Sequence, residues 1–255
     1  MTPRTSAPLR AAAVLLLPLA LTACSSAKDS AAGTGPAVTA TTPSSGATTS
    51  PATTAPAAPA DTDARLLTGD KLRAVLLRGD VLPKGYKADA DGTRDSGLDL
   101  APVAKDGAAG ACGALEQTGW IRISGIESAS FAQGDFLNAK REEFTQEVDT
   151  FRGSGAVTAM TRIQQAFTRC AHFTDSGSGS PVPVKVKSGP IAGSNGQSIK
   201  AVLTSDQWEG GTTLVATRVG NSVITTFYAV QSADLGAADV AFTQKIAKNL
   251  ARAQR

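Results

Sequence analysis

The stretch "TTLVATRVGNSVITTFYAV", Thr212 to Val230, decides the fold because it reads as two strands joined by a tight turn. β-Branched and aromatic residues dominate both halves. Gly220-Asn221 between them is a pair of the kind that short hairpin loops require. Closing the hairpin across this pair places Leu214 opposite Phe227 on one face of the strands. We therefore expect an antiparallel hairpin in this register.

The sequence on either side of this hairpin extends it into a domain. Upstream, "SIKAVLTSDQW" reads as a third strand, separated from the hairpin by the turn pair Gly210-Gly211. Downstream, "GAADVAFTQKIAKNLARAQ" has the period of an amphipathic helix. Its predicted packing stripe is Ala238, Phe242, Ile246, Leu250 and Ala253. An antiparallel meander followed by a helix predicts an α+β fold with helices packed on one face of the sheet, which leaves the other face for a shallow cleft.

A second amphipathic helix precedes the meander, in "GSGAVTAMTRIQQAFTRCAHF". Ser154 is its predicted N-cap. Its apolar stripe is Ala156, Met160, Ile163, Phe167 and Cys170. Cys170 therefore points inward, whereas His172, the single histidine of the chain, is turned away from that face.

Farther upstream the pattern is weaker. A short amphipathic helix carries Leu72, Val75 and Leu76 on its apolar side, and the Gly/Ala/Asp-rich stretch Gly92–Gly110 is predicted to be a loop. "CGALEQTGW" predicts a further helical turn. "IESASFAQ" and "EEFTQEVDTFR" are read as two strands of a hairpin, although the second also matches a helical face. Its glutamates, Glu142, Glu143 and Glu147, are read as a solvated face.

Residues 1–23 read as a signal peptide, since Arg4 and Arg10 precede the apolar run Ala11–Leu21. That run is too short to span a bilayer. "LTAC", Leu21 to Cys24, resembles the bacterial lipobox, and this resemblance implies that Cys24 carries diacylglycerol. An ordinary signal peptide with a chance cysteine is the alternative. We expect a membrane partner through the lipid on Cys24 and a location on the outer face of the cytoplasmic membrane.

Residues 24–62 are rich in Ala, Thr, Pro and Ser, with no aromatic residue. Such a segment buries too little apolar surface to offset the entropy of ordering it, so we predict a disordered tether. Residues 63–255 are long enough for one domain with a sizeable core.

The remaining cysteines, Cys112 and Cys170, then form an even pair in an oxidising exterior, where a disulfide is the usual state. A nucleophilic thiolate beside His172, or half of a metal site, is the alternative. A thiolate needs an exposed, electropositive setting, which the inward position of Cys170 does not offer. We expect one disulfide and no metal site.

Charge gives little information about partners. Removing Arg4 and Arg10 leaves 23 basic residues (25 − 2) against 22 acidic ones. Neither a nucleic-acid partner nor a polybasic membrane patch is indicated.

The order of these segments resembles that of actinobacterial lipoproteins with the PknH-like extracellular sensor domain. The most specific shared feature is the helix ending in Cys170 and followed by an aromatic residue. The resemblance implies a twisted antiparallel sheet, a cleft for a small molecule and no enzymatic activity. Kinase-linked members of that family have two disulfides, whereas this domain has cysteines for one. Exported lipoproteins of PsbP-like topology are the closest rival.

We expect the domain to bind or sense a small molecule or a cell-envelope component. Candidate ligand-binding residues are Trp120, Trp208 and Tyr228, although aromatic residues in sheets are more often core. The alternative is a lipid carrier or envelope assembly factor, which needs a large apolar cavity. An enzyme is not expected, because no catalytic elbow or metal-ligand cluster is present, and no cofactor is implied.

Overall fold

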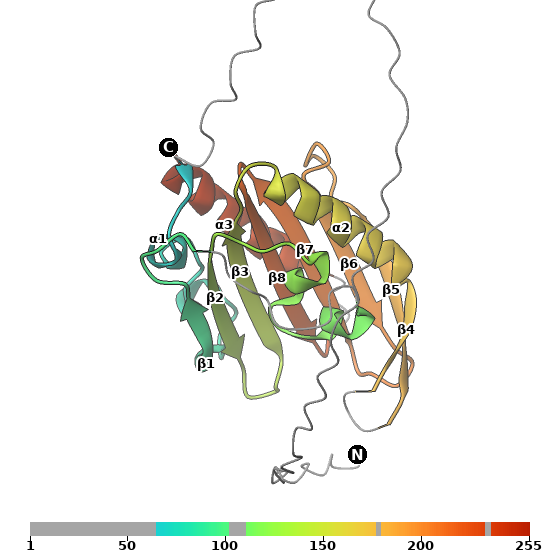
Figure 1. The fold of residues 1–255 in the computed structure, drawn as a ribbon. Helices are drawn as coiled ribbons and strands as arrows, with labels where there is room; N and C mark the ends of the chain where they lie inside the picture. Colours follow the sequence, from blue (N-terminus) through green and yellow to red (C-terminus); the bar gives the residue numbers. More distant parts are fainter. Residues whose placement is uncertain (1–64, 102–110, 177–179, 233–235) are drawn as a thin grey trace, which may run out of the picture. The chain divides into compact units, whose positions relative to one another are not determined.

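The computed structural model of the chain describes residues 65–101, 111–176, 180–232 and 236–255. The predicted signal peptide, Cys24 and the predicted tether lie outside these residues. The described part folds around one twisted antiparallel sheet (Figure 1). The sheet has eight strands in the order β1-β2-β3-β8-β7-β6-β5-β4.

The strands are β1 (Lys87–Asp95), β2 (Ser130–Leu137), β3 (Glu143–Thr150), β4 (His172–Asp175), β5 (Val182–Pro190), β6 (Ser198–Thr204), β7 (Gly211–Val219) and β8 (Ser222–Val230). The α-helices are α1 (Gly69–Arg73), α2 (Gly155–Arg169) and α3 (Ala237–Ala253). Short 3-10 turns are η2 (Gly79–Val81), η3 (Cys112–Glu116) and η4 (Trp120–Ser124).

The predicted hairpin is confirmed as β7 and β8, with Leu214 opposite Phe227. Gly220 in its turn has a left-handed φ of 57°, which costs glycine little. Gly210, before β7, has a φ of 85°. A Cβ at this position would lie 1.9 Å from the carbonyl oxygen of Val230. Glycine is therefore required at Gly210 for β7 to begin where it does.

Each side of the sheet carries its own buried core, and we call the sides the α2 face and the α3 face after the helix that covers each. Leu214 and Phe227 pack under α2 with η3 and η4, whereas Ile224 and Tyr228 pack under α3 and α1. The α+β class, the antiparallel sheet and the disulfide are confirmed. Helices cover both faces, however, and not the single face predicted. Side chains alternate along a strand, and β7 and β8 carry apolar residues at both sets of positions, so both faces need cover.

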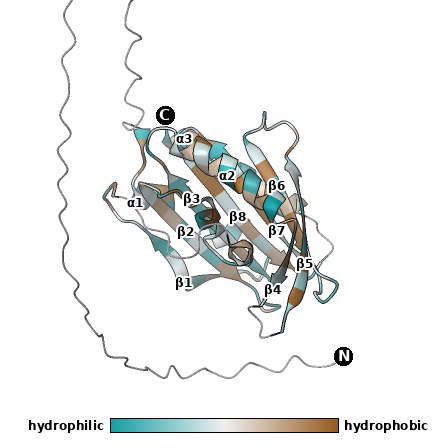
Figure 2. Cartoon of the chain, turned by 45° about the vertical axis from the view of Figure 1, so that its right-hand side comes forward, coloured by the Kyte–Doolittle hydropathy of each residue, from teal (hydrophilic) through white to brown (hydrophobic). Residues whose placement is uncertain are grey.

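The predicted stripe of α2 is confirmed, since every member is buried: Ala156, Met160, Ile163, Phe167 and Cys170. Figure 2 shows hydrophilic residues on the outward side of this helix. In α3, Phe242, Ile246 and Leu250 are buried as predicted, but Ala253 is exposed. The contact at this end of α3 comes instead from Gln254, whose amide donates to the hydroxyl of Ser222 at 3.1 Å.

The hairpin of β2 and β3 is confirmed, and the predicted helical turn appears as η3 and η4. Part of the predicted loop Gly92–Gly110 instead belongs to β1, an exposed edge strand whose pairing with β2 shifts register between Asp89 and Arg94. Residues 102–110 lie outside the described residues. β4 and β5 were not predicted. The described part supplies two buried clusters and a disulfide of its own, so we expect it to fold without residues 1–64.

Candidate functional site

Trp120, a predicted ligand-binding residue, is buried in η4 with 1% of its surface exposed. Its indole nitrogen donates to the carbonyl oxygen of Thr226 at 3.1 Å. Its ring lies 5.6 Å from that of Phe167 in α2. Trp120 thus attaches η4 to β8 and to α2, which is a structural contact.

The other two predicted aromatic residues lie on opposite faces. Tyr228 is buried on the α3 face, among the rings of Tyr86, Phe144 and Phe242. Trp208, in the turn after β6, is half-buried and packs against the core of the α2 face. The structure does not bring the three together, and their role in ligand binding stays a prediction.

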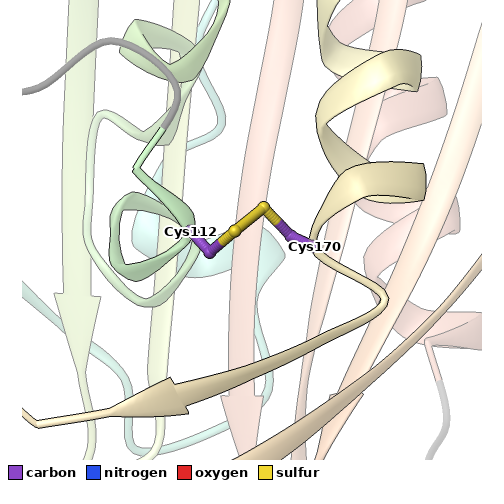
Figure 3. The surroundings of a disulfide bond; sticks show 2 residues. All are labelled: Cys112 and Cys170. Atoms are coloured by element: carbon purple, nitrogen blue, oxygen red, sulfur yellow. A yellow bond between two sulfur atoms is a disulfide. The ribbon is translucent and has the colours of Figure 1, made fainter.

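The disulfide between Cys112 and Cys170 positions η3 beside the end of α2 (Figure 3). Cys112 is the first residue of η3, and Cys170 follows the last residue of α2. Their Cα atoms lie 5.6 Å apart across a sequence separation of 58 residues. Because both sulfurs are bonded, neither forms a thiolate for chemistry with His172, which is exposed in β4.

A pocket of about 490 Å³ lies where η3 meets β4. Most of its lining residues are polar in type: Gly113, Glu116, Gln117, Thr174, Asp175 and Ser176. The volume falls within the range of small-molecule sites, roughly 300–1,000 Å³. This pocket is the candidate functional site.

The carboxyl groups of Glu116 and Asp175 interact in this pocket. Burial is the main cause that raises the pKa of Glu116 to about 8, and the charge of Asp175 and a hydrogen bond with it contribute to the same shift. The raised pKa favours the protonated form of Glu116 at neutral pH. Oxygen Oε1 of Glu116 is buried, and no described residue hydrogen-bonds to it.

A second polar cluster lies on the α2 face of β2 and β3. Arg94 donates to the side-chain oxygen of Gln133 at 3.3 Å, and the amide of Gln133 donates to both oxygens of Asp135 at 3.0 Å. Burial raises the pKa of Asp135 to about 6, although hydrogen bonds from Gln133 and Thr145 oppose this shift. The cluster fastens β1 to β2.

Glu147 does not belong to a solvated face, contrary to the interpretation of its sequence, because only 2% of its surface is exposed. It lies opposite Gln133 on the neighbouring strand. The alternation Glu143, Thr145, Glu147 and Asp149 along β3 was the available signal for this buried polar row. The sequence of β3 alone does not show that β2 lies beside this row, so the burial of Glu147 was not predicted.

Within the described segments, no three His, Cys, Asp or Glu side chains are close enough together to hold a metal ion. None of the helices described is both long and apolar enough to cross a bilayer. The predicted lipidation at Cys24 lies outside the described residues.

Comparison with known proteins identifies a related fold. No family model matches the sequence, and no curated protein does. Among solved structures, the extracellular domain of PknH from Mycobacterium tuberculosis is similar, with a TM-score of 0.53 and 12% sequence identity. The similarity covers 73% of this chain and 97% of that domain. At this level of identity the chain shares the fold of that extracellular domain.

Proposed function

We propose that the chain is an extracytoplasmic lipoprotein, anchored through Cys24, whose domain binds a small polar ligand in the pocket of Glu116 and Asp175. The signal segment and "LTAC" support export and anchoring. A disulfide supports the same compartment, since disulfides persist in oxidising surroundings. The shared fold with an extracellular domain is consistent with this location.

The observation that carries the proposed ligand is the meeting of two carboxyl groups, those of Glu116 and Asp175, in the lining of one pocket. Two carboxyl groups in one pocket attract a ligand that brings its own donors, because a protonated amine takes the place of the proton on Glu116, which leaves the net charge unchanged, and hydrogen-bonds to both groups. The disulfide holds η3 in place, so the pocket exists before the ligand arrives. We infer that the ligand carries an amine or a comparable hydrogen-bond donor.

Titration calorimetry of the folded protein with small amines and amino sugars, such as glucosamine and putrescine, tests this function. We expect binding that releases protons at pH 7 and is weakened at least tenfold by Glu116→Gln and by Asp175→Asn. Glu127→Gln removes an exposed carboxylate elsewhere and is the matched control. Equal binding by all three variants, or no binding by the wild type, contradicts the proposed site.

Anchoring needs its own test. Mass spectrometry of the protein extracted from membranes should find Cys24 as the first residue, carrying diacylglycerol, whereas Cys24→Ala should abolish this mass. An unmodified amino terminus would refute the anchor and leave the ligand pocket unaffected.

A lipid carrier stays the alternative function. It is tested by extracting purified protein with organic solvent and searching the extract for co-purified lipid by mass spectrometry. Stoichiometric lipid would favour the carrier over the polar-ligand pocket.

A further inference from the structure

All the ionisable residues on the exposed side of α3 are basic. From Val240 to Arg255 the sequence has four basic residues and no acidic one. Lys245, Lys248 and Arg252 are all exposed, and their spacing of three and four residues places them on one side of the helix. Since Phe242, Ile246 and Leu250 face the sheet, this basic side faces away from it.

The same side of the sheet continues the positive charge beyond α3. In β5, Val184 and Val186 are buried on the α2 face, so Lys185 and Lys187 point to the α3 side. Lys185 pairs with the exposed Asp206, with 3.3 Å between Nζ and Oδ2.

Lys200 of β6 connects the two groups. It lines a pocket of about 550 Å³ between the end of β5 and the start of α3. The other lining residues are Pro190, Ile191, Ala192, Gly236, Ala237 and Val240, which are apolar or small. We call Lys185, Lys187, Lys200, Lys245, Lys248 and Arg252 the basic face, and this pocket lies within it.

Protection of a sheet edge explains only part of this arrangement. Lysines near the edge of a sheet hinder pairing with other chains, and this accounts for Lys185 and Lys187 in β5. It does not account for Lys245, Lys248 and Arg252, which lie on a helix. The composition of the chain is nearly neutral, and it gave no indication of a basic patch. In the structure, however, exposed basic residues gather on the α3 side of the domain.

We propose that the basic face rests against an anionic phospholipid surface. Six cations on the α3 side of the domain, one of which lines a pocket of otherwise apolar or small residues, complement a layer of phosphate groups above acyl chains. The length of the chain that precedes the described domain also supports a phospholipid surface as the partner. If the 38 residues from Ser25 to Thr62 form the tether that the sequence predicts, they would span about 35 Å, and a domain anchored as proposed above would reach the bilayer that holds it. This inference goes beyond the proposed ligand pocket, which lies at η3.

Flotation with lipid vesicles tests the proposal on residues 25–255 purified without the lipid anchor, so the outcome does not depend on acylation of Cys24. We expect binding to vesicles containing phosphatidylglycerol, no binding to vesicles of phosphatidylcholine alone, and release at about 0.5 M salt, where charges are screened beyond a few Å. Each basic residue near such a surface contributes about a fivefold factor. The combination Lys245→Gln, Lys248→Gln and Arg252→Gln should therefore weaken binding at least tenfold.

The matched control is Lys84→Gln, Lys87→Gln and Lys140→Gln, which removes the same charge from exposed positions outside the basic face. It should bind nearly as well as the wild type. Equal loss in both combinations would show attraction by net charge alone and overturn the proposal. Absence of binding to phosphatidylglycerol vesicles would also overturn the proposal, even if the protein bound a soluble anionic polymer.

Discussion

Glu116 and Asp175 line the same pocket because the disulfide brings their segments together. Glu116 lies four residues after Cys112, and Asp175 lies five residues after Cys170, so the two carboxyl groups follow the two halves of the cross-link. The cross-link thereby places an acidic residue of η3 against an acidic residue of β4, and burial keeps one of them protonated.

Stability should fall as pH rises through the range in which Glu116 loses its proton. Its pKa is raised from 4.5 to about 8 in the folded protein. The folded state then binds the proton more tightly than the unfolded state. Stability is fully present below pH 4.5 and is lost as pH rises towards 8. Because Glu116 is partly exposed, we expect a loss on the order of 1 kcal/mol.

Denaturant unfolding of wild type and Glu116→Gln between pH 5 and 8 measures this loss, since the amide cannot ionise. Asp135 titrates in the same direction in both proteins, so their difference isolates Glu116. A difference that does not change with pH would contradict the assignment.

Removing the disulfide should destabilise the domain by roughly 4 kcal/mol, because the bond closes a loop of 58 residues. Cys112→Ala with Cys170→Ala, compared with wild type by urea unfolding, gives the value. The native protein should also resist thiol alkylation until it is unfolded and reduced. In the protein of residues 25–255, which lacks Cys24, a thiol that reacts in the folded state would show that the bond is absent.

Trp120→Phe should cost about 2–4 kcal/mol, since it leaves a cavity in the core and removes the donor to the carbonyl of Thr226. Trp208→Phe, at a half-buried position in a turn, should cost less than about 1.5 kcal/mol. Chemical unfolding of both variants checks the order. A smaller loss for Trp120→Phe would mean that Trp120 is not the structural contact described.

Gly210→Ala should prevent normal pairing of β7 with β8. Its added carbon would lie 1.9 Å from the carbonyl oxygen of Val230, in a backbone conformation with φ of 85°. We expect a loss above about 2 kcal/mol, seen as a lower melting temperature. Gly189→Ala is the control, because its Cβ would meet nothing within 4 Å. It should melt close to the wild type.

Sequence reasoning predicted the elements whose signal is local. The β7–β8 register follows from a two-residue turn, and the buried stripe of α2 follows from helical period. β1 was missed because an edge strand that pairs on one side needs little apolar content. The placement of α3 was missed because alternation identifies two faces without saying which helix covers each.

The candidate site shows the same limit. Sequence supplied the disulfide, but Glu116 and Asp175 are far apart in the chain and belong to no motif. Three candidates were chosen for their aromatic side chains, and the structure places Trp120 and Tyr228 in its two cores. The raised pKa of Glu116 depends on burial and on a neighbour from another segment, and neither is visible in a linear pattern.

Because both faces of the sheet are covered, the domain presents two different outer surfaces on opposite sides. The polar pocket opens beside η3 of the α2 face, and the lysines of β5 and α3 point the opposite way. If the basic face rests on the bilayer as proposed, the proposed ligand pocket would open away from the bilayer. The proposed membrane contact and the proposed ligand pocket would then use separate surfaces, and the pocket would stay open to soluble molecules while the domain lies on the membrane.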